Sequence, residues 1–262
     1  MSVGVIGLGY VGLPLAHAFW RAGINTIGFD IDPTKIEKLS RGDTYIKHFP
    51  AKNVTAMNVS GRFRATVDIT ELAKVDAILI CVPTPMNATR EPDLDFVVAT
   101  AKSIKPHLRP GMLVLLESTA YPSTTTEAVQ PILEGGGLNA TSEFLLAVLP
   151  EREDPGNRIK TSAIPKIVGG VDAEAGELSA AFYGQAFSKV HMGRRLQQRP
   201  PTFLTGLQNN GGFRRSPPRN RPSRCAPRWL RTHAGCSTRA ERRINRRGSN
   251  CHWMKSQWQV AI

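Results

Sequence analysis

Residues 3–12 read VGVIGLGYVG, an apolar run that leads directly into a Gly-x-Gly-x-x-Gly pattern. The apolar run predicts a buried strand, and the glycines predict a turn that opens a helix. Gly7 permits a tight turn, Gly9 lets the backbone approach a pyrophosphate, and Gly12 allows the helix to pack closely on the strand. In this context the pattern is typical of a dinucleotide-binding turn, and its alternative is a chance run of glycines.

The helix that this turn opens would present main-chain N–H groups near Tyr10 and Val11, and the positive end of its dipole, to a phosphate. Asp30 lies at the end of the next predicted strand, where a carboxylate can accept both ribose hydroxyls of an adenosine. Lys35, one turn into the following helix, could reach the same edge of the cofactor. Because a carboxylate repels a 2′-phosphate, these residues favour NAD over NADP.

Short apolar runs alternate with helical patterns through residues 1–192, which is the order that a parallel sheet with helical crossovers requires. The sequence predicts an α/β fold with a doubly wound, Rossmann-like parallel sheet. The predicted strands are Val3–Ile6, Asn25–Phe29, Phe63–Val67, Ala77–Val82, Leu113–Glu117 and Phe144–Val148.

Helix starts are predicted from capping residues. Asp32 before Pro33 predicts one helix start, and Asp172 predicts another, with its helix running to about Phe187. Thr124 with Glu127 predicts a capping box for a helix through Leu133 that ends at the glycines 135–137.

Two further loops follow predicted strands at the edge where open α/β sheets bind ligands. One holds Pro83 and Thr84, and the other holds Ser118 and Thr119, so these residues are predicted to line the cofactor pocket. The alternative is ordinary turn chemistry. A third loop, residues 150–157, is densely charged, and by itself such a run is usually a solvated face.

The charge of the chain is divided sharply near Met192. Residues 1–192 hold 18 basic and 20 acidic side chains, whereas residues 193–262 hold 16 basic and one acidic. The second segment is rich in Arg, Pro, Gly and Ser without apolar periodicity, which predicts a disordered basic tail. Its Arg bias also resembles a GC-rich coding region translated in the wrong frame, so we hypothesise a frameshift near codon 192.

Other functions of the tail are weaker interpretations. Its positive charge would bind nucleic acid non-specifically at low salt, although no module pattern of stacking aromatics is present. A zinc site from Cys225, His233, Cys236 and Cys251 fits no common ligand spacing, and no metal is predicted. Four scattered cysteines, no signal peptide and no long apolar run favour a cytoplasmic protein.

Five ordered motifs together resemble the UDP-glucose/GDP-mannose dehydrogenase family, with most likeness to its UDP-N-acetylglucosamine 6-dehydrogenase branch. The resemblance covers about residues 1–192. The motifs are GLGYVGLP (residues 7–14), GFDID (28–32), VPTP (82–85), ESTAYP (117–122) and PEREDPGN (150–157).

The resemblance implies a homodimeric enzyme that oxidises the primary alcohol of a UDP-sugar to a carboxylate in two NAD-dependent steps, for surface polysaccharides. It implies catalytic roles for Thr119 and Glu151, with Glu151 assisting thioester hydrolysis through a water, and it places Glu151 and Arg152 at the nucleotide sugar. The implied cofactor contacts are Gly7, Gly9, Tyr10, Val11, Gly12, Asp30, Lys35, Pro83, Thr84, Ser118 and Thr119.

The chain departs from the family pattern downstream. The family carries its catalytic cysteine in a Gly-Gly-His-Cys motif, beside a lysine, an asparagine and a substrate domain, and the sequence contains none of these. Cys81 lies in a predicted buried strand and is interpreted as a core residue. Cys236, in the segment His-Ala-Gly-Cys, is interpreted as a chance match. We therefore expect a truncated dehydrogenase that binds NAD and turns over little or no UDP-sugar.

Overall fold

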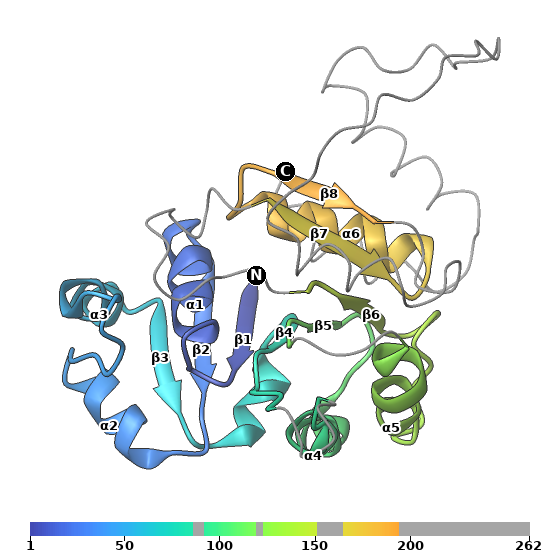
Figure 1. Cartoon of the computed structure of the whole chain (residues 1–262), viewed down its shortest axis with the longest axis horizontal. Coiled ribbons are helices and arrows are strands. Elements are labelled where there is room, and N and C mark those ends of the chain that lie inside the picture. Colours follow the sequence, from blue (N-terminus) through green and yellow to red (C-terminus); the bar gives the residue numbers. More distant parts are fainter. Residues whose placement is uncertain (86–91, 119–122, 151–164, 194–262) are drawn as a thin grey trace, which may run out of the picture. The chain divides into compact units, whose positions relative to one another are not determined.

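The structure, a computed structural model, describes residues 1–85, 92–118, 123–150 and 165–193 (Figure 1). The predictions for Thr119, Glu151, Arg152 and the basic tail concern residues outside these ranges. The strands in the described ranges are Ser2–Ile6 (β1), Asn25–Phe29 (β2), Phe63–Thr66 (β3), Ala77–Ile80 (β4), Leu113–Leu116 (β5), Leu145–Val148 (β6), Lys166–Gly170 (β7) and Val190–Met192 (β8).

Helices connect most of these strands. The α-helices are Gly12–Arg21 (α1), Pro33–Ser40 (α2), Ala51–Val59 (α3), Asp95–Ile104 (α4), Gln130–Glu134 (α5) and Ala173–Gly184 (α6). Short 3₁₀ helices span Ile69–Lys74 (η1) and Lys105–His107 (η2), and a π-helical turn spans Thr124–Val129 (η3).

The strands form one sheet in the order β3-β2-β1-β4-β5-β6-β7-β8. Neighbouring strands from β3 across to β6 are parallel, β7 is antiparallel to β6, and β8 is parallel to β7. The order reverses at β1, because β2 and β3 extend the sheet on one side while β4, β5 and β6 extend it on the other. Open α/β sheets bind their ligands at such a switch point, outside the carboxyl ends of the strands.

Both faces of the sheet are covered by helices, which explains why its central strands are apolar on both sides. On one face, Val97 of α4 and Leu133 of α5 belong to a buried cluster with strand residues such as Ile78 and Val114. On the other face, Phe19 of α1 stacks on Phe182 of α6, with ring centroids 4.6 Å apart. Figure 1 shows α4 and α5 on one side of the strands and α6 on the opposite side.

The predicted α/β class and the doubly wound parallel sheet are confirmed, and each of the six predicted strands forms with ends shifted by at most two residues. Two strands were missed. These are β7 and β8, which flank α6 in the sequence. Their apolar stretches near Val168 and Val190 are short, so the sequence does not distinguish them from loops.

Two of the three predicted helix caps are confirmed. Asp32 accepts a hydrogen bond from Thr34 N–H at the start of α2, and Asp172 accepts one from Ala175 N–H at the start of α6. The capping box at Thr124 was wrong. The chain turns one residue earlier, at Ser123, whose φ is +71°, so Ser123 occupies the N-cap position and Thr124 is the first residue of the π turn.

The structure also locates Cys81 just past the end of β4, buried with 9% exposed. Its interpretation as a core residue agrees with that burial. In the portion of the chain that is described, no helix has the length and apolar character needed to cross a membrane.

Candidate functional site

Most of the predicted site residues that the structure describes follow strands that end at the same edge of the sheet. Ile6 at the end of β1 pairs with Phe29 of β2 and with Ile80 of β4, and Ile80 pairs with Leu116 of β5. Since these strands are parallel and end level with one another, the loops that follow them begin side by side. The glycine turn, Asp30 and the two loops after β4 and β5 are therefore brought together by the register of the sheet.

The glycine turn connects β1 to α1, and two of its glycines are required by the backbone. Gly7 has φ +90°, and a Cβ there would lie 2.7 Å from the carbonyl oxygen of Cys81. At Gly12 a Cβ would lie 1.9 Å from the carbonyl oxygen of Gly7. The turn is thus packed against its own backbone and against the end of β4, and neither position can accept a side chain without a shift of main chain.

Gly9 differs from the other two glycines because a Cβ there would meet no atom within 4 Å. Nothing in the fold of the described residues demands a glycine at this position, so its bare backbone leaves an open approach to the turn. Tyr10, the next residue, is 57% exposed. An anion can approach main-chain amides closely where no Cβ intervenes, which is the role that the middle glycine has in dinucleotide turns.

Helix α1 begins at Gly12, three residues after the open glycine Gly9. Val11 occupies the N-cap position in an αR conformation, and among the described residues no side chain caps the helix and no acidic side chain stands in its first turn. The first N–H groups of a helix have no partner within the helix, and its dipole makes that end electropositive. The N-terminus of α1 is therefore suited to hold a phosphate.

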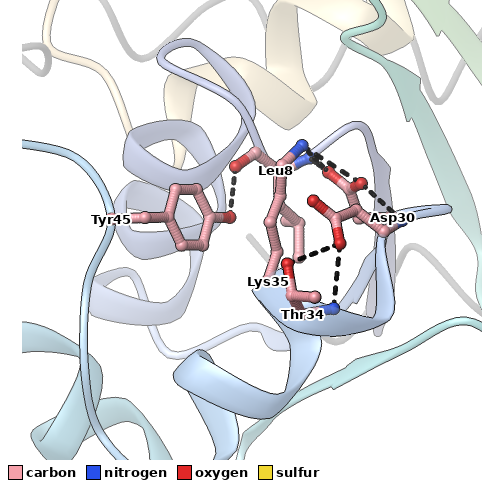
Figure 2. Close-up of polar contacts among 6 residues, drawn as sticks. Leu8, Asp30, Thr34, Lys35 and Tyr45 are labelled. Atoms are coloured by element: carbon pink, nitrogen blue, oxygen red, sulfur yellow. Dashed lines mark hydrogen bonds and ion pairs between the residues drawn. The ribbon is translucent and has the colours of Figure 1, made fainter.

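Asp30 follows β2 and connects it to the glycine turn. The residue is buried, with 9% exposed, and its carboxylate accepts a hydrogen bond from the main-chain N–H of Leu8 at 2.9 Å and another from Asp32 N–H at 3.0 Å. The Lys35 ammonium lies 2.9 Å from Oδ2 and 3.2 Å from Oδ1 (Figure 2). Both oxygens are consequently held in place by the protein before any ligand arrives.

Tyr45 completes this network, although no motif in the sequence selects this residue. It lies in the segment between α2 and α3, and its hydroxyl donates to the main-chain carbonyl of Leu8 (Figure 2). The Lys35 ammonium lies 5.8 Å from the centre of its ring. Burial, with the Asp30 and Asp32 carboxylates, raises the pKa of Tyr45 well above its ordinary value, so the hydroxyl remains protonated.

The N-terminus of α2 is capped by the side chain of Asp32. Asp32 accepts hydrogen bonds from Thr34 N–H at 2.9 Å and from the Thr34 hydroxyl at 2.7 Å, and these bonds lower the pKa of Asp32. Ile31, between the two acids, is 91% exposed, and Val67, just past β3, is 56% exposed. A fixed negative charge and two exposed apolar side chains thus stand at the ends of β2 and β3.

The two remaining loops are joined to each other by Ser118. This residue is 7% exposed, and its hydroxyl donates to the carbonyl of Val82 at 2.6 Å. The Ser118 hydroxyl, which is predicted to line the pocket, therefore forms a hydrogen bond that links the loop after β5 to the loop after β4. Pro83 is exposed and Thr84 is half-buried in the same loop.

No metal site is indicated by the described residues, since no three His, Cys, Asp or Glu side chains among them gather closely enough to hold an ion. The chemistry of the described site rests on main-chain amides, one buried carboxylate and one ammonium.

Comparison with known proteins identifies the type of domain. Residues 1–187 match the model of the NAD-binding domain of the UDP-glucose/GDP-mannose dehydrogenase family. The match ends close to Met192, where the charge and composition of the chain change.

Among curated relatives, UDP-N-acetyl-D-glucosamine 6-dehydrogenase of Pseudomonas aeruginosa is 36% identical over 186 residues, which is 70% of this chain and 43% of that protein. UDP-N-acetyl-D-mannosamine dehydrogenase of Salmonella typhi is 36% identical over 192 residues, 45% of its length. The chain therefore spans less than half the length of these relatives.

Solved structures of nucleotide-sugar dehydrogenases also match this chain. The UDP-D-ManNAc dehydrogenase of Pyrococcus horikoshii matches with a TM-score of 0.69 and 29% identity, over 75% of this chain and 47% of that one. A ternary complex of GDP-mannose dehydrogenase from Pseudomonas aeruginosa matches with a TM-score of 0.69 and 26% identity, over 74% and 46%.

Proposed function

This chain belongs to the UDP-glucose/GDP-mannose dehydrogenase family through the family's NAD-binding domain, and from that premise we propose that it is the cofactor half of an NAD-dependent nucleotide-sugar 6-dehydrogenase. One observation supports the proposal above the others. The open backbone at Gly9, the uncapped N-terminus of α1 and the buried carboxylate of Asp30 all lie at one edge of the sheet.

In this proposal the turn at Gly7–Gly12 and the N-terminus of α1 hold the pyrophosphate through main-chain N–H groups. Tyr10 and Val11 contribute their amides, because they lie between the open glycine and the first residue of the helix. The site needs no arginine or lysine on the pyrophosphate, since the helix N-terminus supplies both donors and positive potential.

Asp30 would accept the adenosine ribose hydroxyls. Two of its hydrogen bonds come from main-chain amides of Leu8 and Asp32 and stay in place, whereas the third partner, Lys35, has a side chain that is 33% exposed. The flexible ammonium can move aside and share the carboxylate with a ribose. Ile31 and Val67 offer exposed apolar surface at the neighbouring strand ends for the adenine ring.

When bound, NAD would accept the hydride that is removed in oxidation of the sugar alcohol. Pro83, Thr84 and Ser118 are proposed to shape the cofactor site from the loops after β4 and β5, with Ser118 joining those loops. The catalytic roles of Thr119 and Glu151, and the place of Glu151 and Arg152 at the nucleotide sugar, remain proposals carried by the family motifs that contain these residues. A carboxylate beside the reacting carbon can act as a general base near neutral pH.

The substrate and its turnover form a separate part of the proposal. The curated relatives act on UDP-N-acetyl-D-glucosamine and UDP-N-acetyl-D-mannosamine, according to their names. We propose a UDP-sugar of this class as the substrate. The absence of a Gly-Gly-His-Cys motif from the 262 residues leads us to expect that the chain by itself binds NAD without significant production of uronate. The proposal includes a cytoplasmic location, where NAD and nucleotide sugars are available.

Calorimetric titration of the full chain with NAD, NADH and NADP tests the proposed function. We expect NAD to bind with a Kd between roughly 1 µM and 1 mM, the range of typical enzyme KM values, and NADP to bind more weakly. An absence of heat with millimolar NAD would contradict the proposal. Incubation with each UDP-sugar and NAD, followed at the absorbance of NADH, tests turnover separately.

We also propose that the cofactor site is complete within residues 1–192 and that residues 193–262 add nothing to it. Comparing the full chain with a chain ended at Met192 tests this division. We expect the two forms to bind NAD within about twofold of each other, since the family match ends before the basic segment. Retention on DNA at increasing salt, measured for both forms, tests the alternative that the basic segment binds nucleic acid.

A further inference from the structure

The peptide units around Leu8 are held from two sides by residues distant in the sequence. Asp30 accepts a hydrogen bond from the N–H of Leu8 at 2.9 Å, and Tyr45 donates its hydroxyl proton to the carbonyl of the same residue. Figure 2 shows Asp30 and Tyr45 on opposite sides of the Leu8 main chain. Leu8 stands between Gly7 and Gly9, so this pair of bonds fixes the middle of the turn.

The turn needs such support because its glycines lack side chains that would restrict the backbone. Gly7 and Gly9 flank Leu8, and glycine has the widest choice of conformations of any residue. The Leu8 side chain is fully buried, which holds one part of the residue, but burial of a side chain does not set the direction of its carbonyl. The hydrogen bond from Tyr45 sets that direction.

The direction of the Leu8 carbonyl matters for anion binding. A carbonyl oxygen that turned toward the opening at Gly9 would present a partial negative charge to a phosphate and would turn the following N–H away from it. A hydroxyl donor on that oxygen prevents this rotation. A donor also draws electron density from the peptide, so that the adjoining N–H becomes a better hydrogen-bond donor.

Tyr45 is suited to this role by its surroundings. The groups that face it are the Lys35 ammonium, 5.8 Å from its ring centre, and the carboxylates of Asp30 and Asp32. The ammonium is held on Asp30 and not on the phenol oxygen. The hydroxyl therefore keeps its proton and acts as a donor to Leu8.

We propose that Tyr45 is a positioning residue of the cofactor site, which holds the Leu8 carbonyl away from the pyrophosphate and thereby prepares the glycine turn to bind it. The inference rests on the proposed binding of NAD. It assigns to the α2–α3 segment a part in cofactor affinity that none of the glycine motif residues reveals.

The variant Tyr45→Phe tests the proposal, because it removes only the hydroxyl and keeps the ring beside Lys35. NAD and ADP, which carry the pyrophosphate, would be titrated calorimetrically, and adenosine, which lacks it, would be titrated by NMR. We expect Tyr45→Phe to weaken NAD and ADP by about tenfold, the effect of one hydrogen bond, and to leave adenosine within about twofold.

The matched control is Tyr183→Phe, the same chemical change at a buried tyrosine of α6 that takes no part in the site. It should leave the affinity for all three ligands unchanged. The variant Tyr45→Phe can also lower the melting temperature. Partial unfolding would reduce the apparent affinities for NAD and adenosine alike, so the ratio of the two affinities still tests the proposal. Both affinities are therefore measured at low temperature, where the protein is folded.

Equal affinity of wild type and Tyr45→Phe for NAD would overturn the proposal and leave the proposed function intact. Equal losses for NAD and adenosine would also overturn it, because they would indicate a general structural role. Failure of the wild-type chain to bind NAD would remove the proposed function together with this inference.

Discussion

The carboxylate of Asp30 accepts a hydrogen bond from the main-chain N–H of Leu8 at 2.9 Å, which joins the end of β2 to the glycine turn after β1. The two proposed parts of the cofactor site, the turn for the pyrophosphate and the acid for the ribose, are therefore joined by a hydrogen bond. A substitution in either part should therefore alter the conformation of the other.

Replacement Asp30→Asn should weaken NAD binding by about ten- to a hundredfold, since hydrogen bonds to a charged acceptor are worth roughly 1.5–3 kcal/mol. The amide can serve only one of the donors from Leu8 and Asp32 and leaves the Lys35 ammonium without its counter-charge. Titration with NAD and NADP measures the effect, and the preference for NAD should shrink. Asp43→Asn, an exposed acid in the same crossover, is the control. An unchanged NAD affinity in Asp30→Asn would remove Asp30 from the site.

Replacement Gly9→Ala should separate binding from folding. A Cβ at this position meets no atom within 4 Å, so we expect the melting temperature to stay within about 1 °C of wild type. The methyl group would stand where the pyrophosphate approaches, so NAD affinity should fall by about tenfold or more. Thermal melting and calorimetry on the same sample give both quantities. Full NAD affinity in Gly9→Ala would show that the ligand does not approach there.

Replacement Gly12→Ala should instead destabilise the fold. Its Cβ would lie 1.9 Å from the carbonyl oxygen of Gly7, and backbone atoms cannot give way as a flexible side chain can. Overpacking of this kind costs about 1–3 kcal/mol, which lowers the melting temperature by roughly 5 °C. Melting of the ligand-free protein is the measurement. A melting temperature of Gly12→Ala equal to that of wild type would contradict the prediction.

Stability should decline below neutral pH through His17. This residue of α1 stacks on Trp20 and meets Phe49 edge-on, and burial, followed by the charge of Arg21, lowers the pKa of His17 below its usual 6.5. The unfolded chain then binds the proton more readily than the folded one, so the stability present above pH 6.5 is lost as pH falls through the lowered pKa. Melting temperatures of wild type and His17→Gln at about pH 8 and pH 5 isolate the effect. We expect a smaller drop between the two pH values in His17→Gln, and equal drops would contradict the assignment.

Replacement Tyr183→Phe should leave stability unchanged or raise it. The side chain is fully buried against Phe19 and Phe187, and its hydroxyl has no hydrogen-bond partner in the part of the molecule that the structure describes. An unsatisfied buried hydroxyl costs about 1–3 kcal/mol, so its removal should not lower the melting temperature. A clear decrease on thermal melting would mean that the hydroxyl does make a stabilising bond.

Much of the fold could be predicted from the sequence because its signals are local. The apolar runs before Gly7 and Asp30 and the Asp32-Pro33 cap each act within a few residues, and the structure forms a strand, a turn or a helix at each. The Thr124 cap failed because the competing turn at Ser123, with φ +71°, began the helix one residue earlier. A capping pattern does not distinguish which of two adjacent polar residues, here Ser123 and Thr124, takes the N-cap position.

The sequence by itself determined the class of fold, the position of the glycine turn and the acid at the end of the second strand, because spacing along the chain sets each of these. Only the tertiary structure decided which residues complete the site. Tyr45 meets Leu8 across 37 residues, and Ser118 meets Val82 across 36. Such contacts depend on the register of neighbouring parallel strands and on the path of the crossover between them, and no local pattern of residues encodes either one.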